Sequence, residues 1–170
     1  MGKYDAYQSS DIFESFRKGK GLILNPATLA FTIADNPHPA DDKGYSKAKY
    51  SNYELAEIQI NGWQGSGKTR PFMYELKNLM DGNYRHHVRP IIQNNMSYHT
   101  DYKGWIVDWD TMAEKLQRLG EKMLAQDVSP MLKPVEKTTQ KKKNQYGYGN
   151  KTLYATGELF KALRVEVNYI

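Results

Sequence analysis

The stretch EIQINGWQGSGKTRPFMYEL (Glu57–Leu76) can be interpreted in two ways, and the choice between them decides the fold. Its centre, Gly62–Thr69, matches the pattern G-x-x-x-x-G-K-[ST] of loops that bind the phosphates of a nucleotide. On that interpretation the lysine contacts the phosphates and the threonine contacts Mg²⁺. The nucleotide-binding residues would then be Gly62, Gly67, Lys68 and Thr69.

The residues around this loop favour a simple connection instead. Apolar and polar residues alternate over 53–60, which predicts a strand with one wet face. A phosphate-binding loop follows a buried parallel strand, whose sequence is a nearly continuous apolar run. Such a loop also leads directly into a helix, and here Pro71 falls in the first turn of that helix. No alternation of strands and helices typical of a doubly wound sheet is visible, and Asp108 follows only a short apolar run. We therefore expect no nucleotide, no cofactor and no enzyme activity.

Helices are predicted on both sides of the chain's midpoint. Proline is tolerated in a first helical turn, so Pro71 opens a helix that Asp81-Gly82 ends, with Phe72 and Leu76 on its apolar side. A short strand is expected over 105–109. A longer amphipathic helix then runs over 111–125, with Asp110 or Thr111 as its cap and Glu114 completing a capping box.

The remaining segments complete an α+β fold with an antiparallel sheet packed against two or three helices and long flexible loops. We expect a short helix at 11–18, two strands within 21–35 broken at Asn25-Pro26, a short helix at 156–163 and a final strand at 164–170. The segments 36–52 and 129–152 are predicted to be extended loops or arms, and 83–103 an irregular insertion. The whole chain, 1–170, is expected to form a single domain.

Composition excludes several classes of site. The chain has no cysteine, so it has no disulfides, thiolate nucleophiles or cysteine-ligated zinc. The adjacent histidines His86 and His87 point in different directions on any regular element, and no carboxylate lies at metal-ligand spacing, so no metal is expected. No apolar run reaches the roughly 18 residues that a spanning helix needs, and the N-terminus does not resemble a signal peptide. We expect a soluble protein without membrane contact.

Positive charge is concentrated in one part of the chain. The formal net charge is +5, and residues 128–152 hold six lysines and one glutamate, so the rest is neutral overall. Such a tract is either a solvated surface or a contact for DNA or for a protein partner. The candidate contact residues are Lys133, Lys137, Lys141, Lys142, Lys143 and Lys151.

Three blocks in order resemble the tail-completion, or neck, proteins of tailed bacteriophages. LAEIQING…TRPFMYEL is similar to a strand that leads through a glycine loop into a helix opened by Arg70, Pro71 and Phe72. The 111–125 helix and the loop rich in proline and lysine follow. LYATGELFKALRVEV (Leu153–Val167) is similar to the closing motif of that family, with Thr156, Gly157 and Leu159 at its start. The resemblance covers roughly residues 53–170, and the N-terminal part departs from it.

This resemblance implies a structural virion protein without catalysis, located at the head–tail joint and made in the host cytoplasm. It implies a homo-oligomeric ring, a hexamer rather than a dodecamer, around the channel through which double-stranded DNA passes. Its partners would be the neighbouring connector, neck and tail proteins. Two alternatives stay open from the residues alone: the nucleotide-binding protein described above, and a small nucleic-acid-binding module that uses the lysine tract with Tyr146 and Tyr148.

Overall fold

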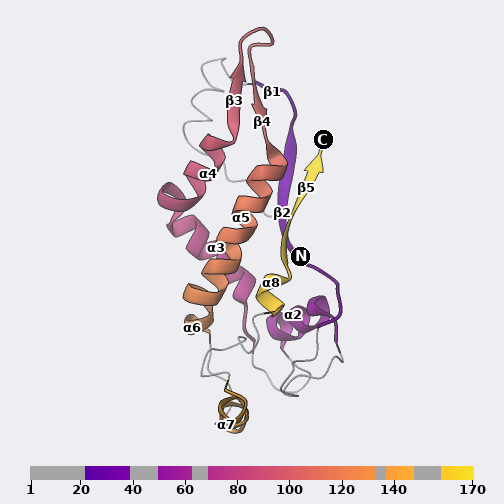
Figure 1. The fold of residues 1–170 in the computed structure, drawn as a ribbon, viewed down its shortest axis with the longest axis vertical. Helices are drawn as coiled ribbons and strands as arrows, with labels where there is room; N and C mark the ends of the chain where they lie inside the picture. Colours follow the sequence, from indigo (N-terminus) through magenta and orange to yellow (C-terminus); the bar gives the residue numbers. More distant parts are fainter. Residues whose placement is uncertain (1–21, 39–49, 63–68, 133–136, 148–157) are drawn as a thin grey trace. The chain divides into compact units, whose positions relative to one another are not determined.

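The chain is an α+β protein in which runs of helices separate single or paired strands along the sequence (Figure 1). The computed structural model describes residues 22–38, 50–62, 69–132, 137–147 and 158–170. The predicted helix at 11–18 and most of the predicted arm at 36–52 lie outside these residues. The described strands are β1 (Leu22–Ile23), β2 (Ala27–Ile33), β3 (Met96–His99), β4 (Gly104–Val107) and β5 (Leu163–Tyr169). The described helices are α2 (Asn52–Asn61), α3 (Phe72–Gly82), α4 (Arg89–Asn94), α5 (Trp109–Met123), α6 (Ser129–Met131), α7 (Lys137–Gln145) and α8 (Glu158–Lys161), with π-helical turns η1 (Tyr84–Val88) and η2 (Leu124–Val128).

The chain forms two compact units. The first combines the described residues of Met1–Thr32 with Asn83–Leu119 and Val165–Ile170, and the second combines those of Ile33–Gly82 and Gly120–Arg164. The boundaries fall inside β2, α5 and β5, so these three elements belong to both units. Whether the chain unfolds as the single domain expected from its length stays a prediction.

A three-stranded sheet in the order β1-β4-β3 belongs to the first unit (Figure 1). Strands β3 and β4 form an antiparallel hairpin, with Tyr98 opposite Trp105, and β1 pairs with β4 in parallel. The sequence predicted strands around Asn25-Pro26 and at 105–109, and both predictions are confirmed. It did not predict the parallel pair or strand β3.

Asn25 extends the pairing of β1 with β4 beyond the end of β1. Its side-chain amide donates to the Val107 carbonyl at 2.7 Å, and its side-chain oxygen accepts from the Val107 N–H at 3.0 Å. The Asn25 carbonyl accepts from the indole Nε1 of Trp109. An asparagine amide can thus replace a peptide group at the position where Pro26 prevents the strand from continuing.

Helix α5 begins two residues earlier than the sequence predicted, and its cap is Asp108. The Asp108 carboxylate accepts a hydrogen bond from the Thr111 backbone N–H at 3.1 Å. The Asp108 N–H in turn donates to the Asn95 carbonyl at 2.9 Å. A carboxylate at this position satisfies a helix N–H that has no partner within the helix, which is why Asp competes well for the cap.

Segment 83–103 is not an irregular insertion, because η1, α4 and β3 cover most of it. Pro90 lies in the first turn of α4, and the Arg89 N–H donates to the Tyr84 carbonyl, five residues back. A proline has no N–H, and its ring occupies the space of the carbonyl four residues earlier, so the turn before it widens. In the second unit Pro130 stands in the same relation to η2, where the Ser129 N–H donates to the Leu124 carbonyl.

The second unit contains a helix where the sequence predicted a strand. Residues 53–60 are not a strand but part of helix α2. Ser51 and Glu54 form a reciprocal capping box: the Glu54 N–H donates to Ser51 Oγ at 3.1 Å, and the Ser51 N–H donates to Glu54 Oε2 at 2.8 Å. This pair satisfies two backbone donors at the helix start and outweighs the alternation of Ala56, Ile58 and Ile60.

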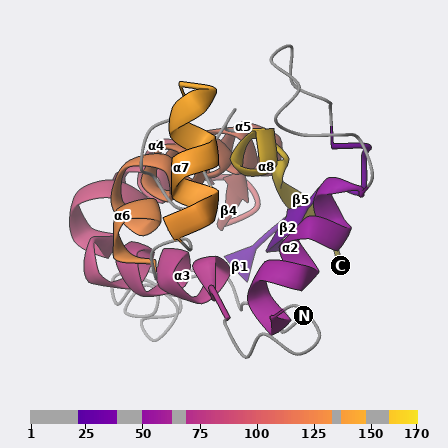
Figure 2. The same ribbon diagram turned by 90° about the horizontal axis from the view of Figure 1, so that it is seen from below.

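The apolar interior of the second unit lies between helices (Figure 2). Helix α2 contacts both α3 and α8, and α3 contacts η2. The helix predicted from Pro71 is confirmed as α3, with Leu76 and Met80 almost fully buried. The buried apolar residues of this unit include Ala56, Phe72, Met73, Leu124, Val128, Leu132, Phe160 and Leu163.

Candidate functional site

The two sequence blocks that carry the phage resemblance meet inside the second unit. Phe72 at the start of α3 is fully buried, and its ring centroid lies 6.2 Å from that of Phe160 in α8, at an interplanar angle of 53°. Leu159 beside Phe160 is also buried. Tilted aromatic pairs at this separation are favourable, so this contact helps to hold the two helices together.

Arg70 and Pro71 fix how the chain enters α3. The Arg70 N–H donates to the Gln59 carbonyl at 2.6 Å, and Arg70 Nη1 donates to Gln59 Oε1 at 3.1 Å. The Pro71 carbonyl accepts the Glu75 N–H at 3.0 Å, which begins the helical bonding. Arg70 thus acts through its backbone and its side chain, and Pro71 through its backbone. Thr156 and Gly157, from the closing motif, lie outside the described residues.

The glycine loop has a different setting from a phosphate-binding loop. It follows helix α2 rather than a strand, and Gly62 ends that helix with φ of 84°, a conformation that favours glycine. Thr69 is exposed on the far side of the loop. Gly67 and Lys68 lie outside the described residues. The resemblance also implied a strand before this loop, so α2 departs from the phage pattern as well.

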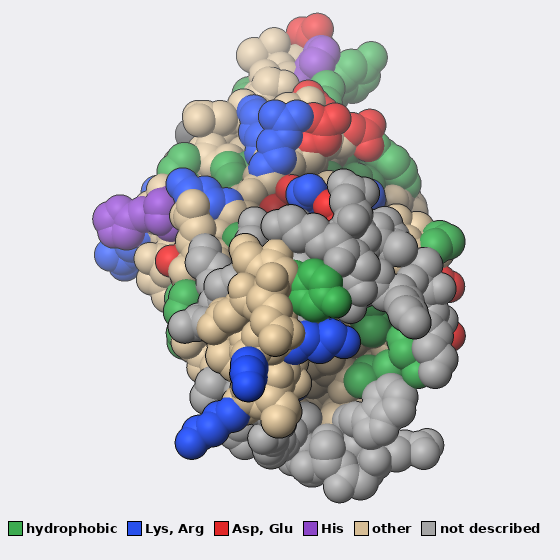
Figure 3. All heavy atoms as spheres, turned by 60° about the horizontal axis from the view of Figure 1, so that its bottom comes forward, with side chains coloured by type: hydrophobic (Ala, Val, Ile, Leu, Met, Phe, Trp, Pro, Cys, Tyr) green, Lys and Arg blue, Asp and Glu red, His purple; other side chains and the backbone are tan. Residues whose placement is uncertain are grey.

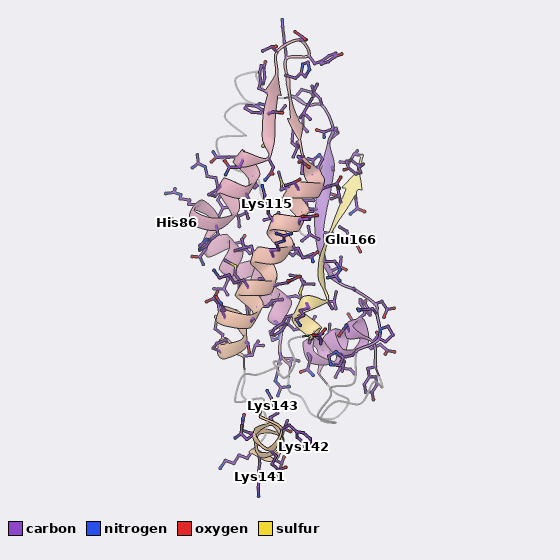
Figure 4. The ribbon with its side chains drawn as sticks, in the orientation of Figure 1. His86, Lys115, Lys141, Lys142, Lys143 and Glu166 are labelled. Carbon is purple, nitrogen blue, oxygen red and sulfur yellow. The ribbon has the colours of Figure 1, made fainter. Side chains whose placement is uncertain are left out.

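The lysine tract is partly helical rather than an extended arm throughout. Helix α7 carries Lys137 and Lys141–Lys143, while Lys133 and Lys151 lie outside the described residues. Lys137, Lys141 and Lys142 are exposed. Figure 4 shows Lys141, Lys142 and Lys143 leaving α7 in different directions, as consecutive residues on a helix must. They cannot all face one ligand on a flat surface.

Lys143 differs from the other lysines because only 3% of it is exposed. Burial lowers the pKa of its ammonium group, since a charged group loses hydration when it leaves water. This side chain therefore has a structural role in α7. Contacts of Lys137, Lys141 and Lys142 with DNA or with a protein stay a prediction.

A basic surface that the sequence analysis did not identify lies on η1 and the start of α4. We call it the Arg85–Arg89 surface: Arg85, His86 and His87 are exposed, Arg89 is half-buried, and Val88 between them is fully buried. Figure 4 shows His86 pointing away from the helices. In Figure 3 histidine side chains at the left edge lie beside blue lysine or arginine side chains, with a red acidic side chain close by.

Exposed apolar side chains occur on both faces of the three-stranded sheet and in the turn between β3 and β4. Leu22 is 65% exposed, Tyr98 43%, Tyr102 70% and Ile106 38%. The Tyr98 ring packs edge-to-face on the Trp105 ring, with ring centroids 5.4 Å apart. The ring centroids of Tyr102 and His99 are 4.7 Å apart. Tyrosines of this kind, apolar in body and polar at the tip, suit contacts between proteins.

No group of three or more potential ligands that could hold a metal occurs among the described residues. Nor does any described helix combine the length and the apolar run that crossing a membrane requires.

Comparisons of the chain with protein-family models, curated proteins and solved structures gave no match.

Proposed function

We propose that this chain is a structural subunit of the head–tail joint of a tailed bacteriophage, a tail-completion or neck protein that works by adhesion and not by catalysis. The observation that carries the proposal is the contact of Phe72 with Phe160, because it brings together the two sequence blocks that resemble this family. Those blocks are far apart in the sequence, and a shared packing role explains why both are present.

The exposed surface of the sheet supports a role in assembly. Leu22, Tyr98, Tyr102 and Ile106 offer apolar contact area on a short sheet whose edge strands β1 and β3 have a free side within the described residues. The strand register places Leu22 and Ile106 on one face of the sheet and Tyr98 on the other, so each face offers a small apolar contact. In the proposed ring these faces contact a neighbouring copy or an adjacent ring protein.

The ring would be a hexamer that surrounds the DNA channel, assembled in the host cytoplasm and retained in the virion. Cyclic symmetry repeats one contact around the axis, so a modest surface on each subunit is enough to close the ring. No nucleotide or metal takes part in this role.

Electron microscopy of the particles made by the phage tests the proposal. Gold-labelled antibodies against this chain should bind at the junction between head and tail. Label on the capsid shell, on tail fibres or only on non-virion material would contradict the proposal. A second preparation, of the purified chain mixed with tail-free heads, should show added density only at the portal vertex.

A further inference from the structure

We propose that the Arg85–Arg89 surface contacts the phosphate backbone of double-stranded DNA. The proposal rests on the proposed function for its choice of DNA as the polyanion. It assigns the DNA contact to a surface on η1 and α4. The sequence predicted the lysine tract as the candidate contact instead.

The charged side chains within residues 83–100 are arginines, and Asp81 and Asp101 flank this segment. Residues 83–100 contain two arginines and three histidines but no aspartate or glutamate. The ion pairs reported for the described residues, Lys77–Asp81, Arg118–Glu114 and Lys161–Glu158, lie on other elements. Within the described part of the chain, no carboxylate pairs with Arg85, His86 or His87. The charge of Arg85 and the N–H donors of all three side chains are therefore available to an external anion.

The widened turn before Pro90 exposes these donors. Because the Arg89 N–H reaches back to the Tyr84 carbonyl, residues 85–87 occupy a π-helical turn, with the buried Val88 on its inner side. Arg85, His86 and His87 leave this turn in successive directions, and all three are exposed. On α7, by contrast, Lys143 is buried. Single π-helical turns often occur at functional sites, which agrees with a binding role.

The chemistry of this surface fits phosphate groups better than an acidic protein. Protein interfaces have an apolar centre with aromatic anchors. No large hydrophobic residue between Tyr74 and Tyr98 is exposed among the described residues, so such a centre is missing here. Arginine binds a phosphate through two parallel hydrogen bonds, and imidazole N–H groups add donors without needing an apolar pocket. One exposed arginine per subunit, Arg85, gives weak binding that a sliding duplex tolerates, and a ring multiplies it.

Titration of the isotope-labelled full chain with a mixed-sequence DNA duplex at low salt, followed by NMR, tests the inference directly. Non-specific protein–DNA contacts of this kind have dissociation constants on the order of 10⁻⁴ M at physiological salt, a range in which fast-exchange shifts are measurable. The largest backbone shifts should fall on Arg85–Arg89. Shifts centred on 137–147, or no saturable shifts at low salt, would overturn the inference. Poly-glutamate in place of DNA should give much smaller shifts; equal or larger shifts would mean that the surface binds an acidic protein.

Two matched substitutions add a quantitative readout. Arg85→Gln and Arg118→Gln each remove one exposed positive charge from the same unit, but Arg118 pairs with Glu114 on α5. Arg85→Gln should weaken DNA binding and reduce the slope of log affinity against log salt by about 0.9, whereas Arg118→Gln should leave both unchanged. Equal effects of the two substitutions on DNA affinity would mean that the affinity depends on the net charge of the chain and not on the Arg85–Arg89 surface.

The failure of this inference can be separated from failure of the proposed function. If Arg85→Gln does not change DNA binding while antibodies still label the junction, only the DNA contact is wrong. If the antibodies label another part of the particle and NMR shifts still fall on Arg85–Arg89, the chain binds DNA in a different setting, and the neck assignment is wrong.

Discussion

The ring of Phe72 lies 6.2 Å from the ring of Phe160, centroid to centroid, and this contact joins the first turn of α3 to α8 within the second unit. Phe72 is wholly buried and Phe160 is 2% exposed. Because α2 contacts both α3 and α8, removal of either ring would leave a cavity among three helices.

Phe160→Ala should lower the free energy of unfolding by about 3–5 kcal/mol, the usual cost of deleting a buried phenyl ring. The measurement is urea denaturation followed by circular dichroism. Tyr74→Ala, on the partner helix α3 but 58% exposed, is the control and should change stability by about 0.5 kcal/mol or less. A loss below about 1 kcal/mol for Phe160→Ala would contradict the packing described.

A double-mutant cycle isolates the ring contact itself. Phe72→Leu and Phe160→Leu each keep an apolar side chain but remove one aromatic ring. We expect a coupling energy of about 0.5–1.5 kcal/mol between the two positions, as for other aromatic pairs. Additive effects of the two substitutions would show that the rings do not interact.

Asn25→Ala should destabilise the first unit, because it removes both hydrogen bonds to the Val107 backbone, at 2.7 and 3.0 Å. A loss of about 1–3 kcal/mol is expected for partners left without a hydrogen bond. Hydrogen exchange of the Val107 amide should accelerate more than exchange within α3. Asn61→Ala is the control. The exposed Asn61 side chain donates a hydrogen bond to Glu57, and its loss should have little effect. Unchanged protection of Val107 would count against the bridge.

Asp108 makes stability depend on pH through the cap of α5. Hydrogen bonds from the Thr111 side chain and backbone lower the pKa of the Asp108 carboxyl below its ordinary value of 3.8. The carboxylate therefore contributes stability that is fully present above pH 3.8 and is lost as the pH falls through the lower, folded-state pKa. Asp108→Asn keeps a capping oxygen but cannot titrate. The difference in unfolding midpoint between wild type and this variant should shrink as the pH is lowered from 6 towards 2.5; a constant difference would show that Asp108 does not cap the helix.

Mg-ATP and Mg-GTP should give no binding heat at millimolar nucleotide in calorimetric titrations. The reason is that Gly62–Thr69 follows helix α2 and has no strand before it to orient a phosphate-binding loop. Lys68→Ala should behave as the wild type does. Micromolar binding that this substitution abolishes would restore the nucleotide-binding alternative.

The elements that the sequence predicted well have a strong local pattern. Helix α5 was predicted from its apolar spacing, and Met112, Leu116 and Met123 are indeed buried. Strand β5 was predicted from the alternation that includes Val165 and Val167. In each case one face of the element is much more apolar than the other. The apolar residues therefore recur with one period, that of a helix in α5 and that of a strand in β5.

The errors arose where two local signals competed. Over 53–60 the alternation of Ala56, Ile58 and Ile60 predicts a strand, whereas the capping box of Ser51 and Glu54 predicts a helix. The structure has the helix, and of these three apolar residues only Ala56 is fully buried. Over 83–103, Pro90 predicts a break in regular structure. In the structure the π-helical turn η1 precedes Pro90, so the helical path continues into α4. The sequence does not predict the Arg85–Arg89 surface for the same reason, since an irregular segment gives no expectation of which side chains are exposed.

Deletion of the gene for this chain from the genome that encodes it tests the proposed role at the head–tail joint most directly. Lysates of the deletion strain, viewed by electron microscopy, should contain DNA-filled heads and complete tails that have not joined. Adding the purified chain, with one side of the joint prepared separately, should restore joined infectious particles. Normal joined particles in the deletion strain, or heads that never fill because an earlier step fails, would contradict the account.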